Sequence, residues 1–318
     1  LQLHGSPAAR EIFQKSLDNS SAAARLDPSY RPAPQNILWT LTYLPAEVGS
    51  VEEVHGVLVR ADQWLTKCKA MNSQLMQCFN NYFQVYARAA ARFLLAGQDP
   101  APQLQVALTN LAETRRLGGN VLDAEQLAAL THLVDAQNRV RHKQDPAAPL
   151  AELQKDLAAC FKIAPTDAMC RTLHAQAEWV QADLLASQGK PNTAALDAAR
   201  IKATLATQSP EPYPDAWSTL AESQLRLARQ KGLPAAARRG QLVAGLAALD
   251  KLSALNPNHA NGLAVRSALL LLQAEGEGDA GKRAALRKDA GQALKQALAL
   301  DPLLAHDYAP LQQAAQGP

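Results

Sequence analysis

Apolar residues recur at intervals of three and four along almost the whole chain. Within residues 51–67, for example, one face of a helix would carry Val54, Val57, Leu58, Ala61 and Leu65. Such stretches end at segments containing Gly, Pro or Asn, which interrupt helices. No stretch alternates apolar and polar residues as a strand does, so we predict an all-α fold.

The pattern predicts a long series of helices joined by short turns. The predicted helices cover residues 7–26, 36–44, 51–67, 73–95, 102–117, 123–142, 149–163, 167–187, 192–207, 215–231, 235–255, 261–274 and 282–300, with a short helix from Leu304. The first two are separated by a connector that contains Pro28, Pro32 and Pro34. At one typical turn, Pro165 prevents a helix from continuing and Asp167 can cap the next one.

Residues 46 positions apart occupy equivalent places in this series. Small residues near the starts of alternate helices form one column: Cys78, Ala124, Cys170, Ala216 and Gly262. Near the ends of the preceding helices, a second column holds Cys68, Thr114, Cys160 and Ala206, and it breaks at Leu252 and Leu298. A fixed period of helix pairs is typical of a solenoid, in which each pair buries its apolar face on the next. Two ordinary helical bundles with a chance spacing are the alternative.

A period of 46 residues suits both HEAT-like and tetratricopeptide-like helix pairs. The last complete unit resembles the second helix of a tetratricopeptide repeat. It has small residues seven apart, Ala290 and Ala297, with Leu294 between them and Pro302 closing the unit. The resemblance implies a right-handed superhelical solenoid of tetratricopeptide-like hairpins, whose first helices line a concave, ligand-facing groove.

The unit before it, residues 245–257, is similar but has Leu252 where a small residue is usual. Earlier units match weakly, so this resemblance covers the chain from Gly245 on. We predict three regions: a helical cap and Pro-rich connector over residues 1–50, the repeat solenoid over 51–302, and a capping helix over 303–318.

The alanine-rich, degenerate repeats and the segment Leu298–Pro302 also resemble the C-terminal regions of some bacterial transmembrane serine/threonine kinases. In those proteins the kinase is cytoplasmic and the repeats lie beyond one membrane span. The chain contains no Gly-rich loop, His-Arg-Asp or Asp-Phe-Gly motif. The resemblance therefore implies only the sensor or docking half of such a protein.

The four cysteines form two pairs, Cys68 with Cys78 and Cys160 with Cys170. Ten residues in an unbroken helix would separate the Cα atoms by about 15 Å, whereas a disulfide needs roughly 4.4–6.8 Å. A turn lies inside each pair, so the second helix can fold back and bring the thiols together. We predict two disulfides and hence an oxidising compartment. Buried free thiols are an alternative, and so is a metal site built from Cys160, Cys170 and His174.

The metal alternative lacks the close Cys-x-x-Cys or His-x-x-x-His pair of most zinc sites. The remaining histidines are scattered one to a helix or loop. The chain contains no Gly-x-Ser-x-Gly, His-Glu-x-x-His or phosphate-loop motif. We therefore predict no enzyme activity, no metal and no cofactor.

Composition narrows the class of partner. A net charge of +3 without a Lys/Arg block does not indicate nucleic-acid binding. No run approaches the roughly 20 apolar residues of a membrane span. Because the sequence begins at Leu1 rather than Met, we expect a processed chain or an excised region, with any membrane tether upstream.

The most suggestive binding face lies on the helix after Ser73. A 4-3-4 spacing places four polar side chains on one side of it: Gln77, Asn81, Gln84 and Arg88. On the helix that follows Cys170, the predicted counterparts are His174, Glu178 and Gln181. Amide and guanidinium groups in a groove can hydrogen-bond the backbone of an extended peptide. An ordinary solvated face is the alternative.

Taken together, these patterns predict a non-catalytic module that binds a protein or peptide segment outside the cytoplasm. It would be the sensor or docking region of a bacterial signalling protein. A cytoplasmic scaffold or chaperone-like adaptor of the same fold, with reduced cysteines, is the second hypothesis.

Overall fold

The computed structural model describes residues 7–27, 29–30, 32–72, 74–119, 121–211 and 213–316. Among these residues all regular structure is helical, which confirms the predicted fold class. Pro28, Ser73 and the outermost parts of the two predicted caps lie outside the described residues. The chain divides into two compact units, which are described separately below.

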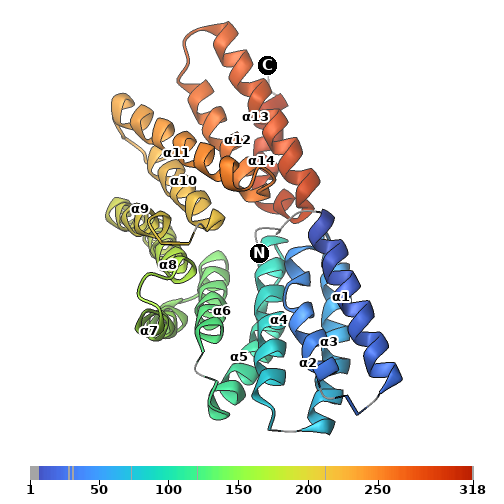
Figure 1. The fold of residues 1–318 in the computed structure, drawn as a ribbon. Coiled ribbons are helices and arrows are strands. Elements are labelled where there is room, and N and C mark those ends of the chain that lie inside the picture. Colours follow the sequence, from blue (N-terminus) through green and yellow to red (C-terminus); the bar gives the residue numbers. More distant parts are fainter. Residues whose placement is uncertain are drawn as a thin grey trace. The chain divides into compact units, whose positions relative to one another are not determined.

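Unit 1 consists of residues 1–139 and 146–163. Its helices are α1 (Pro7–Leu26), α2 (Pro32–Leu41), the 3-10 helix η1 (Leu44–Ala46), α3 (Val51–Met71), α4 (Met76–Leu95), α5 (Ala101–Arg116), α6 (Leu122–Arg141) and α7 (Ala147–Ile163) (Figure 1). The last two residues of α6 belong to unit 2. A core at the middle of unit 1 joins α4, α5 and α6 through Ala90, Leu94, Leu104 and Val134.

Unit 2 consists of residues 140–145 and 164–318. It contains α8 (Ala168–Ser187), α9 (Thr193–Thr207), α10 (Pro214–Ala228), α11 (Ala235–Leu255), α12 (Ala260–Glu275), α13 (Ala280–Leu300), the 3-10 helix η2 (Pro302–Leu304) and α14 (Ala305–Gln316) (Figure 1). One core cluster joins α8, α9 and α10, and a second joins α10, α11 and α12.

The helices alternate between two roles. We call the even-numbered helices from α2 to α14 the A helices and the odd-numbered helices from α3 to α13 the B helices. Each A helix from α2 to α12 is followed by the B helix of its own pair, as α4 is by α5 and α8 by α9. Consecutive A helices also touch, α2 with α4 in unit 1 and α8, α10, α12 and α14 in order in unit 2. Within each unit this is the stacking of a helical repeat protein.

The helix ends follow local rules that the sequence shows. Ser50 Oγ accepts a hydrogen bond from Glu53 N at the start of α3. Asp167 caps α8 in the same way by accepting from Cys170 N at 2.8 Å, as predicted. After several helices the chain reverses at a glycine with positive φ, which other residues rarely adopt: Gly97, Gly118, Gly189 and Gly232.

Two predicted boundaries differ from the structure by four residues, more than any of the others. The helix predicted over 36–44 is α2, which begins four residues earlier at Pro32. Proline is tolerated in the first turn of a helix, where its missing N–H has no helical partner, so the Pro-rich connector is partly helical. The helix predicted to end at Lys67 continues to Met71, so that α3 carries Cys68 in its last turn.

The two 46-residue columns mark the places where a B helix meets the next A helix. Every member of both columns is buried. At the position where the second column breaks, Leu252 is compensated by Gly262, because a Cβ atom at residue 262 would overlap Leu252 Cδ2. A large residue in one column is thus accommodated by the smallest residue in the other.

Candidate functional site

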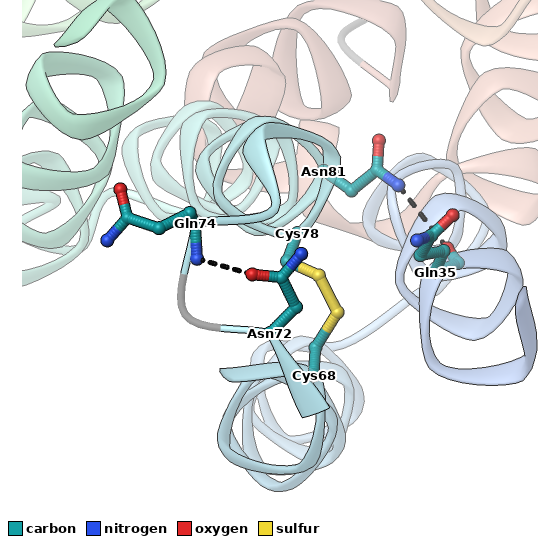
Figure 2. The surroundings of a disulfide bond; sticks show 6 residues. All are labelled: Gln35, Cys68, Asn72, Gln74, Cys78 and Asn81. Atoms are coloured by element: carbon teal, nitrogen blue, oxygen red, sulfur yellow. Dashed lines mark hydrogen bonds between the residues drawn. A yellow bond between two sulfur atoms is a disulfide. The ribbon is translucent and has the colours of Figure 1, made fainter. Parts of the chain in front are cut away.

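The first cysteine pair closes the turn between α3 and α4. Cys68 and Cys78 form a disulfide whose Cα atoms are 6.3 Å apart, and both residues are buried (Figure 2). Inside this turn, Asn72 N donates to Cys68 O at 3.0 Å, and Asn72 Oδ1 accepts from Gln74 N at 2.9 Å. The disulfide fastens a B helix to the A helix of the next pair.

Cys160 and Cys170 are also disulfide-bonded, and the part of the chain that the structure describes has no free cysteine. Cys160 lies in the last turn of α7 and Cys170 in the first turn of α8. The bonded state removes the thiolates on which the predicted metal alternative depends. The four cysteines of the two columns are therefore all used in disulfides.

The four polar residues predicted on α4 do not share one environment. Asn81 Nδ2 donates to the backbone oxygen of Gln35 in α2 at 3.3 Å (Figure 2). Gln84 Nε2 donates to Asp123 Oδ2 at the start of α6 at 2.6 Å. Asn81 and Gln84 are buried, so they hold neighbouring A helices together. Gln77 is exposed, and Arg88 is half-buried.

Arg88 lies above an aromatic ring, with Cζ 5.5 Å from the centroid of Tyr43. Phe13 stacks on the same ring, with the two centroids 5.3 Å apart. The guanidinium is thereby positioned by α1 and the segment between α2 and η1. Of the four predicted side chains on α4, Gln77 is the one that the structure leaves exposed to an incoming ligand.

Two of the residues predicted on α8, His174 and Glu178, face a B helix, whereas Asn81 and Gln84 of α4 face neighbouring A helices. Lys202 Nζ, from the B helix α9, lies 2.6 Å from His174 Nε2 and 2.5 Å from Glu178 Oε1. Gln181 lies half-buried one turn further along α8. His174 and Glu178 lie two repeat lengths after Tyr82 and Tyr86 of α4. They are therefore the counterparts of these tyrosines and not of the four polar residues predicted on α4.

Tyr82 and Tyr86 also face a B helix. Their hydroxyl groups donate to the same atom, Asp62 Oδ1 of α3, at 2.6 and 2.7 Å. The side of α4 that carries Tyr82 and Tyr86 therefore faces a B helix. The equivalent side of α8, which carries His174 and Glu178, also faces a B helix. By the same two-repeat offset, Gln176 is the counterpart of Gln84, and its Nε2 donates to Thr219 Oγ1 of the next A helix at 3.2 Å.

Three polar contacts, which we call the polar ladder, join α8 to α10 along the side of α8 that carries Gln176. Besides the Gln176–Thr219 bond, Trp179 Nε1 donates to Ser223 Oγ at 3.0 Å. Arg226 Nη1 bonds both carboxylate oxygens of Asp183, at 2.9 and 3.0 Å. The bonded residues are 43 or 44 positions apart, close to one repeat length. The ladder fixes the register between consecutive A helices of unit 2.

Arg226 is the most constrained side chain of the polar ladder. It also donates from Nε to Glu222 at 3.0 Å, and its Cζ lies 4.9 Å from the Trp179 ring centroid. Burial alone would lower the pKa of Arg226, but the charges of Glu222 and Asp183 outweigh burial and raise it. The guanidinium is therefore a fixed, paired cation.

Unit 1 also contains a buried charged cluster that was not predicted from the sequence. It is formed by Arg115, Glu125, His132 and Asp156. Arg115 Nη2 lies 2.6 Å from Glu125 Oε2 and 2.8 Å from Asp156 Oδ1. The other oxygen of Asp156 lies 2.6 Å from His132 Nδ1. The carboxylate side chains of Glu125 and Asp156 are only 4% and 3% exposed. Burial would lower the pKa of Arg115, but the bonds to Glu125 and Asp156 raise it above its usual value.

The charged cluster connects three consecutive helices, α5, α6 and α7. The repeat period contains a signal for it. His132 and Asp156 are 24 residues apart, and one repeat later the same two positions hold Glu178 and Lys202, which also pair. Equivalent repeat positions thus join an A helix to its own B helix in both pairs.

Comparison with known proteins shows the fold and no closer relationship. No known protein-family profile matches the chain, and no curated protein sequence matches it. Among solved structures, a chain in the crystal structure of the APC/C hetero-tetramer Cut9-Hcn1 is similar, with a TM-score of 0.51 and 14% sequence identity. The match covers 99% of this chain and 57% of that chain.

The fold is a tetratricopeptide-like helical solenoid. Solenoids of this kind are typically non-catalytic and serve protein–protein interaction. The chain spans little more than half the length of the similar structure, and the likeness is one of fold alone. Among the described residues, no helix has the length and apolar character of a membrane span.

Proposed function

We propose that the chain is a non-catalytic module that binds a protein or peptide segment in an oxidising, extracytoplasmic compartment. The supporting observation is a tetratricopeptide-like stack in which two turns between consecutive pairs carry disulfide-bonded cysteines. Repeat stacks present extended binding surfaces, and disulfides persist in oxidising compartments. The similar structure belongs to a hetero-tetramer, so that protein assembles with other chains.

The proposed binding face is the side of α4 that carries Gln77. An exposed amide offers both a donor and an acceptor to the backbone of an extended peptide. Asn81 and Gln84, on the same side, bond neighbouring helices and would keep this face rigid rather than contact the ligand. A rigid face lowers the entropy lost on binding.

A bulky substitution tests this face. Peptides are first selected from a random library against the oxidised protein, and their affinities are then measured by titration calorimetry. Gln77→Trp should weaken the selected peptides at least tenfold, because the indole is much larger than the exposed amide that it replaces and would block contact with α4. The matched control is Gln105→Trp, at an exposed position of the B helix α5, which should leave the affinities unchanged. Equal affinities for the two variants would contradict the proposed face.

A count of free thiols tests the compartment. Protein isolated from its natural source under a thiol-blocking agent should carry no blocked cysteine, and four after reduction and unfolding. Mass spectrometry reads both numbers directly. Four blocked cysteines in the unreduced protein would instead favour the cytoplasmic scaffold or chaperone-like adaptor.

The resemblance of the last repeats to the extracytoplasmic regions of bacterial transmembrane serine/threonine kinases supports a more specific proposal. In this proposal the chain is the sensor or docking region of a bacterial signalling protein and is tethered by a membrane span upstream of Leu1. The coding sequence upstream of Leu1 tests it, since a span preceded by a kinase domain is required.

A further inference from the structure

His174 occupies an unusual electrostatic position in unit 2. Its Nε2 atom lies 2.6 Å from the ammonium nitrogen of Lys202, which also pairs with Glu178. An ammonium group can only donate hydrogen bonds, so the contact requires that Nε2 carry no proton and act as the acceptor. A neutral imidazole fits this site, and an imidazolium does not.

Two charged groups in the neighbouring elements of unit 2 act on His174. α9 contributes Lys202, and α8 itself contributes Glu178. One turn earlier on α8, Arg171 donates to the backbone oxygens of Leu205 and Pro165. The other packed helix, α10, meets α8 through the polar ladder, which lies on a different stripe. Glu178 only partly opposes the effect of Lys202 on His174, and it is itself paired with Lys202.

We propose that His174 is an acid-sensitive switch, and that its protonation breaks the contact with Lys202 and loosens the α8–α9 pair. Two cations cannot remain at hydrogen-bond distance in a half-buried site, so Lys202 must move away or the helix pair must open. α8 also carries one half of the polar ladder, so a movement of α8 would weaken its contacts with α10. The switch would operate whatever ligand the module binds.

The direction of the pH dependence follows from the site. Burial, followed by the charge of Lys202, lowers the pKa of His174 below 6.5, and Glu178 only partly opposes this. The unfolded chain therefore binds a proton at higher pH than the folded chain does. The stabilisation from His174 is fully present above pH 6.5 and is lost as the pH falls from there through the folded-state pKa.

His132 provides a contrast within the same repeat pattern. Its Nδ1 atom lies 2.6 Å from Asp156 Oδ2 rather than beside a lysine. Asp156 and Lys202 occupy equivalent repeat positions, whereas His174 lies one turn before the position equivalent to His132.

Hydrogen exchange measured by mass spectrometry at pH 7.5 and 5.0, corrected for intrinsic rates, tests the switch on the intact oxidised chain. Peptides from α8 and α9 should open more at pH 5.0, by about tenfold for each unit by which the folded-state pKa lies below the unfolded value. His174→Gln should abolish most of this change, because glutamine can still accept from Lys202 but does not titrate. The control His306→Gln, at a side chain 49% exposed, should keep the full change.

Two outcomes would overturn the proposal. One is an unaltered pH response of α8–α9 in His174→Gln. The other is an imidazole titration of His174 at or above pH 6.5, measured by NMR on the wild-type protein. The NMR titration decides the matter even if His174→Gln does not fold.

Discussion

Asp156→Ala should lower the free energy of unfolding of unit 1 by about 3–5 kcal/mol, the usual cost of breaking a buried ion pair from one side. Asp156 accepts from both Arg115 and His132, and its side chain is almost fully buried. The variant leaves the guanidinium with Glu125 as its one remaining carboxylate partner in the charged cluster, and it leaves the imidazole without its acceptor. Because the charged cluster connects α5, α6 and α7, all three helices should open more readily.

The matched control for this prediction lies on the same helix. Glu152 of α7 pairs with Lys155 at 2.7 Å, but its side chain is 49% exposed. Glu152→Ala should cost at most about 1 kcal/mol, because solvent screens exposed pairs. Native-state hydrogen exchange of peptides from α5–α7, with increasing urea, measures both variants. Similar losses for Asp156→Ala and Glu152→Ala would show that the charged cluster contributes nothing special.

The repeat architecture could be predicted because it rests on local and periodic features. Small residues recur where helices approach closely, and each boundary carries a proline, glycine or capping residue. Asp167, for example, caps α8 as predicted. The disulfide between Cys68 and Cys78 was also predictable, since a turn between two cysteines ten residues apart brings their backbones within range.

The charged cluster was not predicted, because its members come from three helices. Arg115 lies 41 residues before Asp156, and neither residue has an unusual sequence neighbourhood. Their proximity depends on how far each helix is rotated about its own axis. The spacing of residues within one helix does not determine this rotation. The repeat register does contain part of this information, since the pairs His132–Asp156 and Glu178–Lys202 occupy equivalent positions.

The faces of α4 and α8 illustrate the same limit. A 4-3-4 spacing correctly places Asn81 and Gln84 on one side of α4, but it cannot show that neighbouring helices already satisfy them. On α8, His174 and Glu178 were predicted to occupy the comparable side of their helix. The repeat offset instead matches them to the stripe that faces the B helices, where Lys202 lies.

Removing the first disulfide with Cys68→Ala and Cys78→Ala together should lower the free energy of unfolding by about 3 kcal/mol, the chain-entropy value for a loop of about eleven residues. The crosslink restricts the unfolded chain at the turn between α3 and α4, and the variant regains that freedom. Alanine is a suitable replacement because alanines already occupy the equivalent positions 206 and 216, which are also buried. Urea denaturation of the oxidised protein, with hydrogen exchange of peptides from α3 and α4, measures the loss.

Thr114→Ala is the matched control, because Thr114 occupies the position of Cys68 in the next hairpin, where no disulfide is present. Thr114 is buried and its hydroxyl donates to Asn110 O at 2.8 Å, so this variant should lose only about 1 kcal/mol. It should keep the wild-type response to a reducing agent, whereas the double cysteine variant should respond less, since only the second pair can still be reduced. A double variant as stable as Thr114→Ala, with an undiminished response to reductant, would show that the Cys68–Cys78 crosslink does not hold α3 and α4 together.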